Sequence, residues 1–138
     1  MIVLDTDVLS EVMKPAPDPA VAGWMMRESG RGLFTTAVSE AEIIYGITIL
    51  PHGRRKRELE TAAQGVFALL DGRIFPFDSA AAREFAHIVA DRRSAGRPIN
   101  DFDAQIAAIT RSRGMSLATR DVKDFATTGV QLIDPWQP

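Results

Sequence analysis

The sequence contains no cysteine and only two histidines, His52 and His87, among its 138 residues. The lack of cysteine excludes a disulfide scaffold, a thiolate zinc site and a cysteine nucleophile. Two histidines are too few for most metal sites built from imidazole ligands. A metal site in this chain would therefore have to use oxygen ligands.

The chain also lacks any apolar run near the ~18 residues that a membrane span requires, and its first residues do not form a secretory signal. We therefore expect a cytoplasmic protein with no membrane partner. Neither sign of charge dominates, because 16 Lys and Arg against 18 Asp and Glu leave a net charge of −2. Bulk charge thus neither favours nor excludes a nucleic-acid partner. The 46% hydrophobic and 25% charged residues are typical of a globular domain.

Short apolar segments alternate with segments of helical periodicity along the chain. The expected strands cover residues 2–4, 33–35, 74–75, 116–119 and 130–133. The expected helices lie around residues 8–12, between Asp18 and Gly30, over 37–50 and 54–70, after Asp78, and after the 96–99 loop. This alternation predicts the α/β class. We expect a single domain over residues 1–138, with a roughly five-stranded, mostly parallel sheet flanked by helices.

Helical periodicity also predicts which side chains face the core. On the helix over 37–50, the shared face carries Ala41, Ile44, Tyr45 and Thr48. On the helix after the 96–99 loop, Phe102 begins the series of apolar residues. We expect these faces to be buried.

Four acids fall near the carboxyl ends of the expected strands, where parallel sheets bind ligands. Asp5 and Asp121 follow the first and fourth strands. Glu42 lies early in the helix after the second strand, and Asp103 opens the helix before the fourth. Crowded carboxylates resist ionisation unless a cation balances them. Their convergence predicts Mg²⁺ or Mn²⁺, which can activate a water toward a phosphodiester.

Each acid also has a local explanation without any ligand. Asp5, Asp103 and Asp121 could serve only as a helix cap, a first-turn acid and a turn residue. Ser39 could cap its helix, with Glu42 reaching back in a capping box. Because all four explanations would have to hold separately at one sheet edge, we favour a shared site.

The segments that carry these acids resemble, in order, the motifs of PIN-domain ribonucleases, the VapC toxins of bacterial toxin–antitoxin pairs. The matching segments are residues 2–11, residues 41–43 with Gly46, residues 103–108, and residues 118–125 with Gly129-Val130 and Asp134-Pro135-Trp136. The resemblance covers nearly the whole chain and is closest to the FitB-like subgroup. It implies a single PIN-like domain.

The resemblance implies a metal-dependent endoribonuclease whose catalytic and metal-binding acids are Asp5, Glu42, Asp103 and Asp121. Thr6 and Thr119 would be supporting hydroxyls. A water activated by Mg²⁺ or Mn²⁺ would hydrolyse RNA and leave 5′-phosphate and 3′-hydroxyl ends. Asp7 stands where many relatives carry asparagine, and Asp101 is a further acid near the site. These two acids leave the number of bound metals open.

The resemblance further implies partners. These are an RNA substrate, a small VapB- or FitA-like antitoxin that blocks the site, and promoter DNA bound through the antitoxin. A homodimer or a larger heteromeric assembly is also expected. Residues 24–26 and 43–50 are candidate surfaces for it, although we favour core packing for both segments.

Thirteen of the sixteen cations are arginine, whose guanidinium is shaped to bind phosphate or carboxylate. The candidates for contact with RNA phosphates are Arg120 and the run Arg54, Arg55, Lys56 and Arg57. For the run we favour a solvated helix end. For Arg120 a salt bridge to a neighbouring acid is an equal alternative.

Two other functions fit part of the pattern. An apolar strand followed by Asp5-x-Asp7 also resembles the nucleophile motif of haloacid-dehalogenase-like phosphatases, although Leu9 stands where that motif has threonine. A non-catalytic module could instead use the acidic edge to bind a basic peptide.

Overall fold

The computed structural model describes residues 1–138 and contains five parallel strands in one sheet. The strands are β1 (Ile2–Leu4), β2 (Leu33–Thr36), β3 (Ile74–Phe75), β4 (Ser116–Ala118) and β5 (Leu132–Ile133). Their order in the sheet is β3-β2-β1-β4-β5, so the first strand is central. The predicted α/β class and five-stranded parallel sheet are confirmed. The last two strands are shorter than expected, and Thr119 and Val130 lie outside them.

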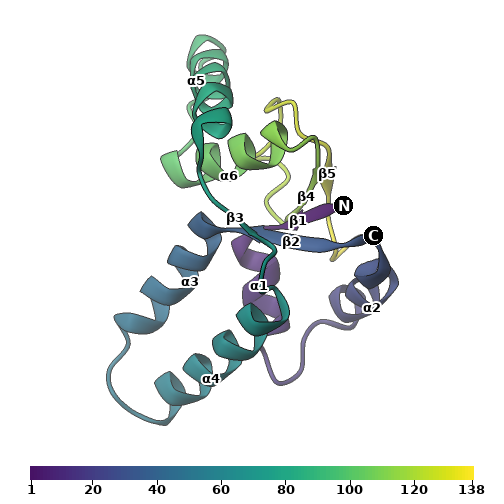
Figure 1. Ribbon diagram of the computed structural model, residues 1–138, viewed down its shortest axis with the longest axis vertical. Coiled ribbons are helices and arrows are strands. Elements are labelled where there is room, and N and C mark those ends of the chain that lie inside the picture. The colour runs from purple at the N-terminus through teal and green to yellow at the C-terminus, as the bar shows by residue number, and fades with distance from the viewer.

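Helices cover both faces of this sheet. They are α1 (Thr6–Val12), α2 (Pro19–Glu28), the 3₁₀ helix η1 (Ser29–Arg31), α3 (Ala37–Thr48), α4 (Arg54–Leu69), α5 (Ser79–Ser94) and α6 (Asp101–Ser112). In Figure 1, α5 and α6 lie on one side of the sheet and α1 to α4 on the other, with α3 and α4 projecting together away from it. None of the helices combines the length and apolarity needed to cross a membrane.

The central strand β1 shows why both faces of the sheet must be covered. Ile2 and Leu4 belong to the core formed with α1 to α4, whereas Val3 belongs to the core formed with α5 and α6. Successive side chains of a strand point to opposite faces. A continuous apolar run is therefore what a strand buried on both sides requires.

Polar side chains cap two of the helices that carry acids, and Asp5 is one of them, as its local explanation allowed. Asp5 Oδ1 accepts a hydrogen bond from the Thr6 N–H at 2.8 Å, and Asn100 Oδ1 accepts one from the Asp103 N–H at 2.8 Å. Both caps have extended backbones, as N-cap residues usually do. The caps fix where α1 and α6 begin, and with that the positions of the nearby acids.

The predicted capping box of Ser39 and Glu42 is wrong. Thr36 is the N-cap of α3, and its Oγ1 accepts a hydrogen bond from the Ser39 N–H at 3.0 Å. Thr36 is the last residue of β2 and is still extended, so the helix begins directly after the strand. Glu42 consequently lies in the second turn, where its side chain can reach another element.

The face predicted for α3 is wrong as well. Ile43 and Ile47 are buried, whereas Ile44 and Tyr45 are 51% and 67% exposed. The apolar residues of α3 lie on more than one side of the helix, so periodicity did not decide which side the sheet and α4 would cover. Phe102 on α6 is likewise 55% exposed, because it lies in the first turn, at the rim of the sheet.

The two candidate interface segments divide between core and surface. Trp24 is buried, which confirms core packing for it, but Met26 is 79% exposed. In the other segment Ile49 is exposed, at the end of α3 farther from the sheet. Core packing was therefore the wrong interpretation for Met26 and Ile49.

Arg92 on α5 is a buried cation without a carboxylate partner. Its Nε donates to the Arg97 carbonyl at 2.7 Å, and its Nη1 donates to the carbonyls of Asp124 and Ala126, each at 2.9 Å. A buried charge is tolerated only where hydrogen bonds replace water. Arg92 thus fastens the loop that follows Asp121 to the helical layer.

We predict that Arg92→Met destabilises the fold by about 2–4 kcal/mol, because methionine keeps the apolar stem but leaves three carbonyls without their donor. Urea denaturation measures the change. The matched control is Arg93→Met on the same helix, where the arginine is exposed, and it should alter stability by less than about 0.5 kcal/mol. Equal effects of the two substitutions would contradict a stabilising role for Arg92.

Candidate active site

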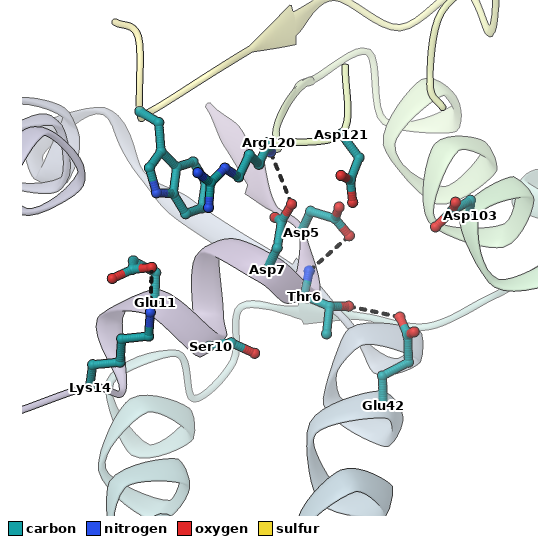
Figure 2. A pocket seen from close by; sticks show the side chains of 11 residues that line it. Asp5, Thr6, Asp7, Ser10, Glu11, Lys14, Glu42, Asp103, Arg120 and Asp121 are labelled. Carbon is teal, nitrogen blue, oxygen red and sulfur yellow. Dashed lines mark hydrogen bonds and ion pairs between the residues drawn. The ribbon is translucent and has the colours of Figure 1, made fainter. Parts of the chain in front are cut away.

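A pocket of about 410 Å³ lies at the carboxyl edge of the sheet, beside the end of β1 (Figure 2). Only one of the eleven residues that line it is hydrophobic. The lining residues are Asp5, Thr6, Asp7, Ser10, Glu11, Lys14, Glu42, Asp103, Arg120, Asp121 and Trp136. The structure therefore brings the four acids singled out in the sequence to one pocket.

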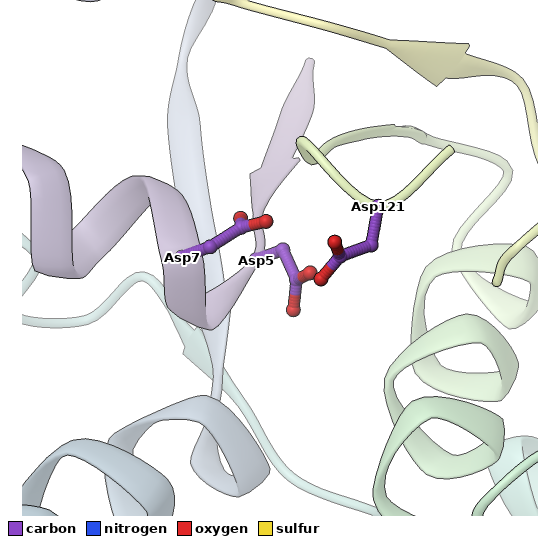
Figure 3. Close-up of side chains that lie close together, drawn as sticks. All are labelled: Asp5, Asp7 and Asp121. Carbon is purple, nitrogen blue, oxygen red and sulfur yellow. The ribbon is translucent and has the colours of Figure 1, made fainter. Parts of the chain in front are cut away.

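Three carboxylates form the tightest group. Oxygen atoms of Asp5, Asp7 and Asp121 all lie within 4.8 Å of one another (Figure 3). Glu42 and Asp103 line the pocket outside this group. The sequence analysis left the role of Asp7 open and did not count it among the ligands. Its position in the first turn of α1, two residues after Asp5, is the signal that could have identified it.

Thr119 links the strand ends that carry the group. Its Oγ1 donates to Asp5 Oδ2 at 2.8 Å and accepts from the Asp121 N–H at 3.0 Å. Leu4 and Ala118 are register partners in β1 and β4, so Asp5 and Thr119 leave neighbouring strands side by side. The Thr6 N–H donates to Asp5 Oδ1, so both oxygens of the Asp5 carboxylate are fixed by hydrogen bonds.

Asp7 has one satisfied and one unsatisfied oxygen. Its Oδ2 accepts a hydrogen bond from the Arg120 N–H at 3.0 Å. Its Oδ1 is buried without any hydrogen-bond partner. An unpartnered buried oxygen is costly, and a cation in the pocket would satisfy it.

The two outer carboxylates are oriented by neighbours. Thr6 Oγ1 donates to Glu42 Oε1 at 2.7 Å, which turns Glu42 from α3 toward α1. Asn100 Nδ2 donates to Asp103 Oδ2 at 2.7 Å. Asp101 is exposed and does not line the pocket.

Burial and mutual repulsion oppose ionisation of this site. Burial raises the pKa of Asp5 to about 7, and the charge of Asp7 adds to the increase. Burial also raises the pKa of Asp7 to about 6, with a further contribution from Asp121. The pKa of Asp103 is raised by burial and then by the charges of Asp124 and Glu42. An all-oxygen donor set of this kind fits a hard divalent cation, whose charge would relieve the repulsion.

The run of cations at residues 54–57 lies elsewhere. It occupies the first turn of α4, at the end of the α3–α4 pair away from the sheet, and does not line the pocket (Figure 1). Arg54 Nε lies 2.8 Å from Glu58 Oε1, and Lys56 Nζ donates to the Thr48 carbonyl at 3.1 Å. These contacts support the solvated helix end that the sequence analysis favoured.

Arg120 is at the pocket, but it does not form the salt bridge considered for it. Its Cζ lies 5.0 Å from the ring centroid of Trp136, and no carboxylate lies within ion-pair distance of the guanidinium. Figure 2 shows Arg120 on the side of the pocket opposite Asp103.

We predict that the metal-free protein loses stability as pH rises from 5 to 8. The folded state keeps a proton on Asp5 between pH 3.8 and about 7, where the unfolded chain has released it. Stability therefore falls as pH rises through this range. A cation competes with the proton, so the rise in melting temperature caused by Mn²⁺ or Mg²⁺ should be small at pH 5 and large at pH 8, and EDTA should reverse it. An equal rise at both pH values would contradict this account.

Thr119→Val should shift cation binding to higher pH. The hydrogen bond from Thr119 lowers the pKa of Asp5. Without this bond Asp5 should therefore ionise at a pH about one unit higher. Calorimetric titration with Mn²⁺ across a pH series measures the midpoint. The control is Thr110→Val, which alters a buried hydroxyl bonded within α6 to the Ile106 carbonyl and should leave the midpoint unchanged. An unchanged midpoint in Thr119→Val would show that this hydrogen bond does not tune the site.

The chain is similar to known proteins over its full length. VapC ribonuclease Y4jK of Sinorhizobium fredii is 37% identical over 139 residues, which is 100% of this chain and 99% of the relative. Toxin FitB of Neisseria gonorrhoeae is 34% identical, with 99% of each chain covered. A solved structure of FitAB bound to an IR36 DNA fragment matches with a TM-score of 0.90 and 34% identity, over 99% of this chain and 96% of that chain.

The family assignment rests on these relatives and on a match to a family description. The PIN domain description matches residues 2–130, which include all six carboxylates that line the pocket. Together with full-length identities above 30%, this match leads to one conclusion: the chain belongs to the PIN-domain family.

Proposed function

We propose that this protein is a metal-dependent endoribonuclease that acts as the toxin of a toxin–antitoxin pair. The observation that carries the proposal is the convergence of carboxylates from four separate segments at one polar pocket. These are Asp5, Asp7, Glu42, Asp103 and Asp121. Similarity to a VapC ribonuclease and to toxin FitB over the full chain supports this function.

We assign Mg²⁺ or Mn²⁺ to the pocket. Asp5, Glu42, Asp103 and Asp121 are the proposed ligands, directly or through water, and Asp7 joins them through its unpartnered oxygen. The all-oxygen donor set and the raised pKa values of the buried acids support this assignment. When bound, such a cation activates water and offsets the negative charge that develops on a phosphoryl oxygen.

The side chains around the acids prepare this chemistry. Thr119 and the Thr6 N–H fix the Asp5 carboxylate, so it does not have to reorganise. The hydrogen bond from the Thr6 hydroxyl occupies one oxygen of Glu42. The other oxygen can orient the attacking water in line with the phosphodiester. Because water attacks, the products carry 5′-phosphate and 3′-hydroxyl ends.

The geometry disfavours the phosphatase alternative. An aspartyl nucleophile must present an ionised, accessible oxygen. Asp5 is only 4% exposed, both of its oxygens accept hydrogen bonds, and burial raises its pKa to about 7. Asp5 is therefore better suited to share a cation than to attack phosphorus.

The proposed partners follow from the relatives. We propose a small VapB- or FitA-like antitoxin that blocks the pocket and connects the protein to promoter DNA, by similarity to FitAB bound to DNA. We also propose a homodimer or larger heteromeric assembly, supported by the exposed apolar side chains Ile44, Tyr45 and Ile49 on α3. The proposed location is the cytoplasm, where RNA is available.

Asp103→Asn tests the function. If Asp103 is a ligand, the variant should cut RNA at least a hundredfold more slowly, while its metal-free form melts no lower than the wild type because a repulsive charge is gone. If Asp103 only complements the dipole of α6, activity should survive and stability should fall by a few tenths of a kcal/mol. Asp101→Asn is the matched control, since Asp101 is exposed on the same turn and does not line the pocket.

The assay is incubation of partner-free protein with total cellular RNA and Mg²⁺ or Mn²⁺, followed by mapping of the cut ends. New 5′-phosphate ends that disappear in Asp103→Asn support the proposal. Tight binding to a basic partner peptide without cuts in any class of RNA would instead support the binding module.

A further inference from the structure

The pair formed by Arg120 and Trp136 stands between two hollows. One is the acidic pocket already described. The other, of about 660 Å³, shares Arg120, Asp121 and Trp136 with it and continues past Lys123 and Gln137, with Asp18, Asp124 and Asp134 also in its lining. A chain leaving the acidic pocket in this direction would have to pass the guanidinium.

The guanidinium of Arg120 is held by stacking and has no partner for its charge. Its Cζ lies 5.0 Å from the Trp136 ring centroid. The backbone N–H of Arg120 donates to Asp7, but no hydrogen bond or ion pair uses the side chain. An arginine stacked flat on an aromatic ring keeps its N–H donors free at the edge. The indole thus keeps a cation next to the carboxylates without an ion pair, and after the hydrogen bonds from Asp18 and Lys14 the Arg120 charge also helps to lower the pKa of Glu11.

The second cation of the pocket is in a different state. Lys14 Nζ lies 3.0 Å from Glu11 Oε1, and Glu11 is itself fixed because its Oε2 accepts the Asp18 N–H at 3.0 Å. Lys14 is therefore already paired. Arg120 is the one cation lining the pocket that is available for an anion from outside.

We propose that Arg120, positioned by Trp136, binds the phosphate adjacent to the one held over the acids, and that the RNA strand passes from the acidic pocket into the second hollow. This inference rests on the proposed function and deepens it. A cation in the acid cluster balances only one phosphate, and the next phosphate would otherwise meet a negative surface. A guanidinium can bind this phosphate with two parallel hydrogen bonds. The strand must be unpaired to follow this path.

The test uses a fluorescent RNA hexanucleotide taken from a mapped cut site, or hexauridylate if no RNA is cut. Binding is measured by anisotropy with Mg²⁺ in the Asp103→Asn background. Adding Arg120→Gln should weaken binding about tenfold and reduce the slope of log K against log[salt] by about 0.7, as expected for one lost phosphate contact on a single strand. Lys14→Gln is the matched control and should have a much smaller effect, because Lys14 is already paired.

A set of hexanucleotides with one neutral methylphosphonate each locates the contact. The Arg120→Gln effect should vanish for one position only, next to the cut linkage. An effect that vanishes at the cut linkage itself, or that persists for every position, overturns the inference. Unchanged RNA binding in Arg120→Gln also overturns the inference. The same holds if the substitution weakens only a complex with an acidic partner peptide and leaves RNA binding unchanged.

Trp136 is a positioning residue in this proposal. Trp136→Leu should reproduce most of the loss seen in Arg120→Gln, and Trp136→Phe should restore binding because a ring is again available for stacking. In Arg120→Gln, Trp136→Leu should cause no further loss. Equal losses in Trp136→Leu and Trp136→Phe would overturn the positioning role.

A protein that binds RNA through Arg120 but cuts none would overturn the proposed function alone, and one that binds no RNA would overturn both.

Discussion

Repulsion among carboxylates at the ends of β1 and β4 is the constraint on which the rest of the structure depends. Asp5, Asp7 and Asp121 place oxygens within 4.8 Å of one another, and Asp5 is almost fully buried. Such a group opposes folding in the absence of a cation, because burial first and neighbouring carboxylates second raise the pKa of Asp5 and of Asp7. The rest of the domain must therefore supply enough stability to hold the acids together. Strain of this kind is common at functional sites.

Rigid local connections in the fold hold the acids together against their repulsion. β1 is buried on both faces and passes directly into α1 through the Asp5 cap. Thr119 ties the end of β4 to Asp5 and to the Asp121 backbone. The loop beyond Asp121 is fastened to α5 by the hydrogen bonds from Arg92 to the Asp124 and Ala126 carbonyls. The acids thus sit on strand ends and helix starts that have little freedom to move apart.

The pocket is polarised as well as acidic. Glu42 and Asp103 lie toward α3 and α6, whereas Arg120 lies on the opposite side (Figure 2), with its guanidinium over the Trp136 ring. An RNA strand with one cation at the acids fits such a surface more easily when it runs toward Arg120 than when it runs toward Glu42 and Asp103. The same separation explains why Arg120 does not cancel the acids: its guanidinium is stacked on the indole, and only its backbone N–H contacts Asp7.

Local patterns in the sequence determined the α/β class, the parallel sheet and the edge at which acids gather. The apolar run Ile2 to Leu4 can be satisfied only by burial on two faces, and each acid lies just after a strand or within the first two turns of a helix. These features depend on neighbours within a few residues, so they can be inferred from spacing. The resemblance to PIN domains added the order of the motifs.

Only the tertiary structure decided which of several equivalent side chains are used. Periodicity did not distinguish Ile43 from Ile44, which are adjacent in a helix with apolar residues on more than one side, and packing against the sheet and α4 made the choice. The closeness of Asp7 to Asp121 likewise depends on β1 and β4, which pair across more than a hundred residues of chain, and the stacking of Arg120 on Trp136 depends on the pairing of β4 with β5. Such contacts leave no local period in the sequence, because their geometry is set by the register of the sheet rather than by neighbouring residues.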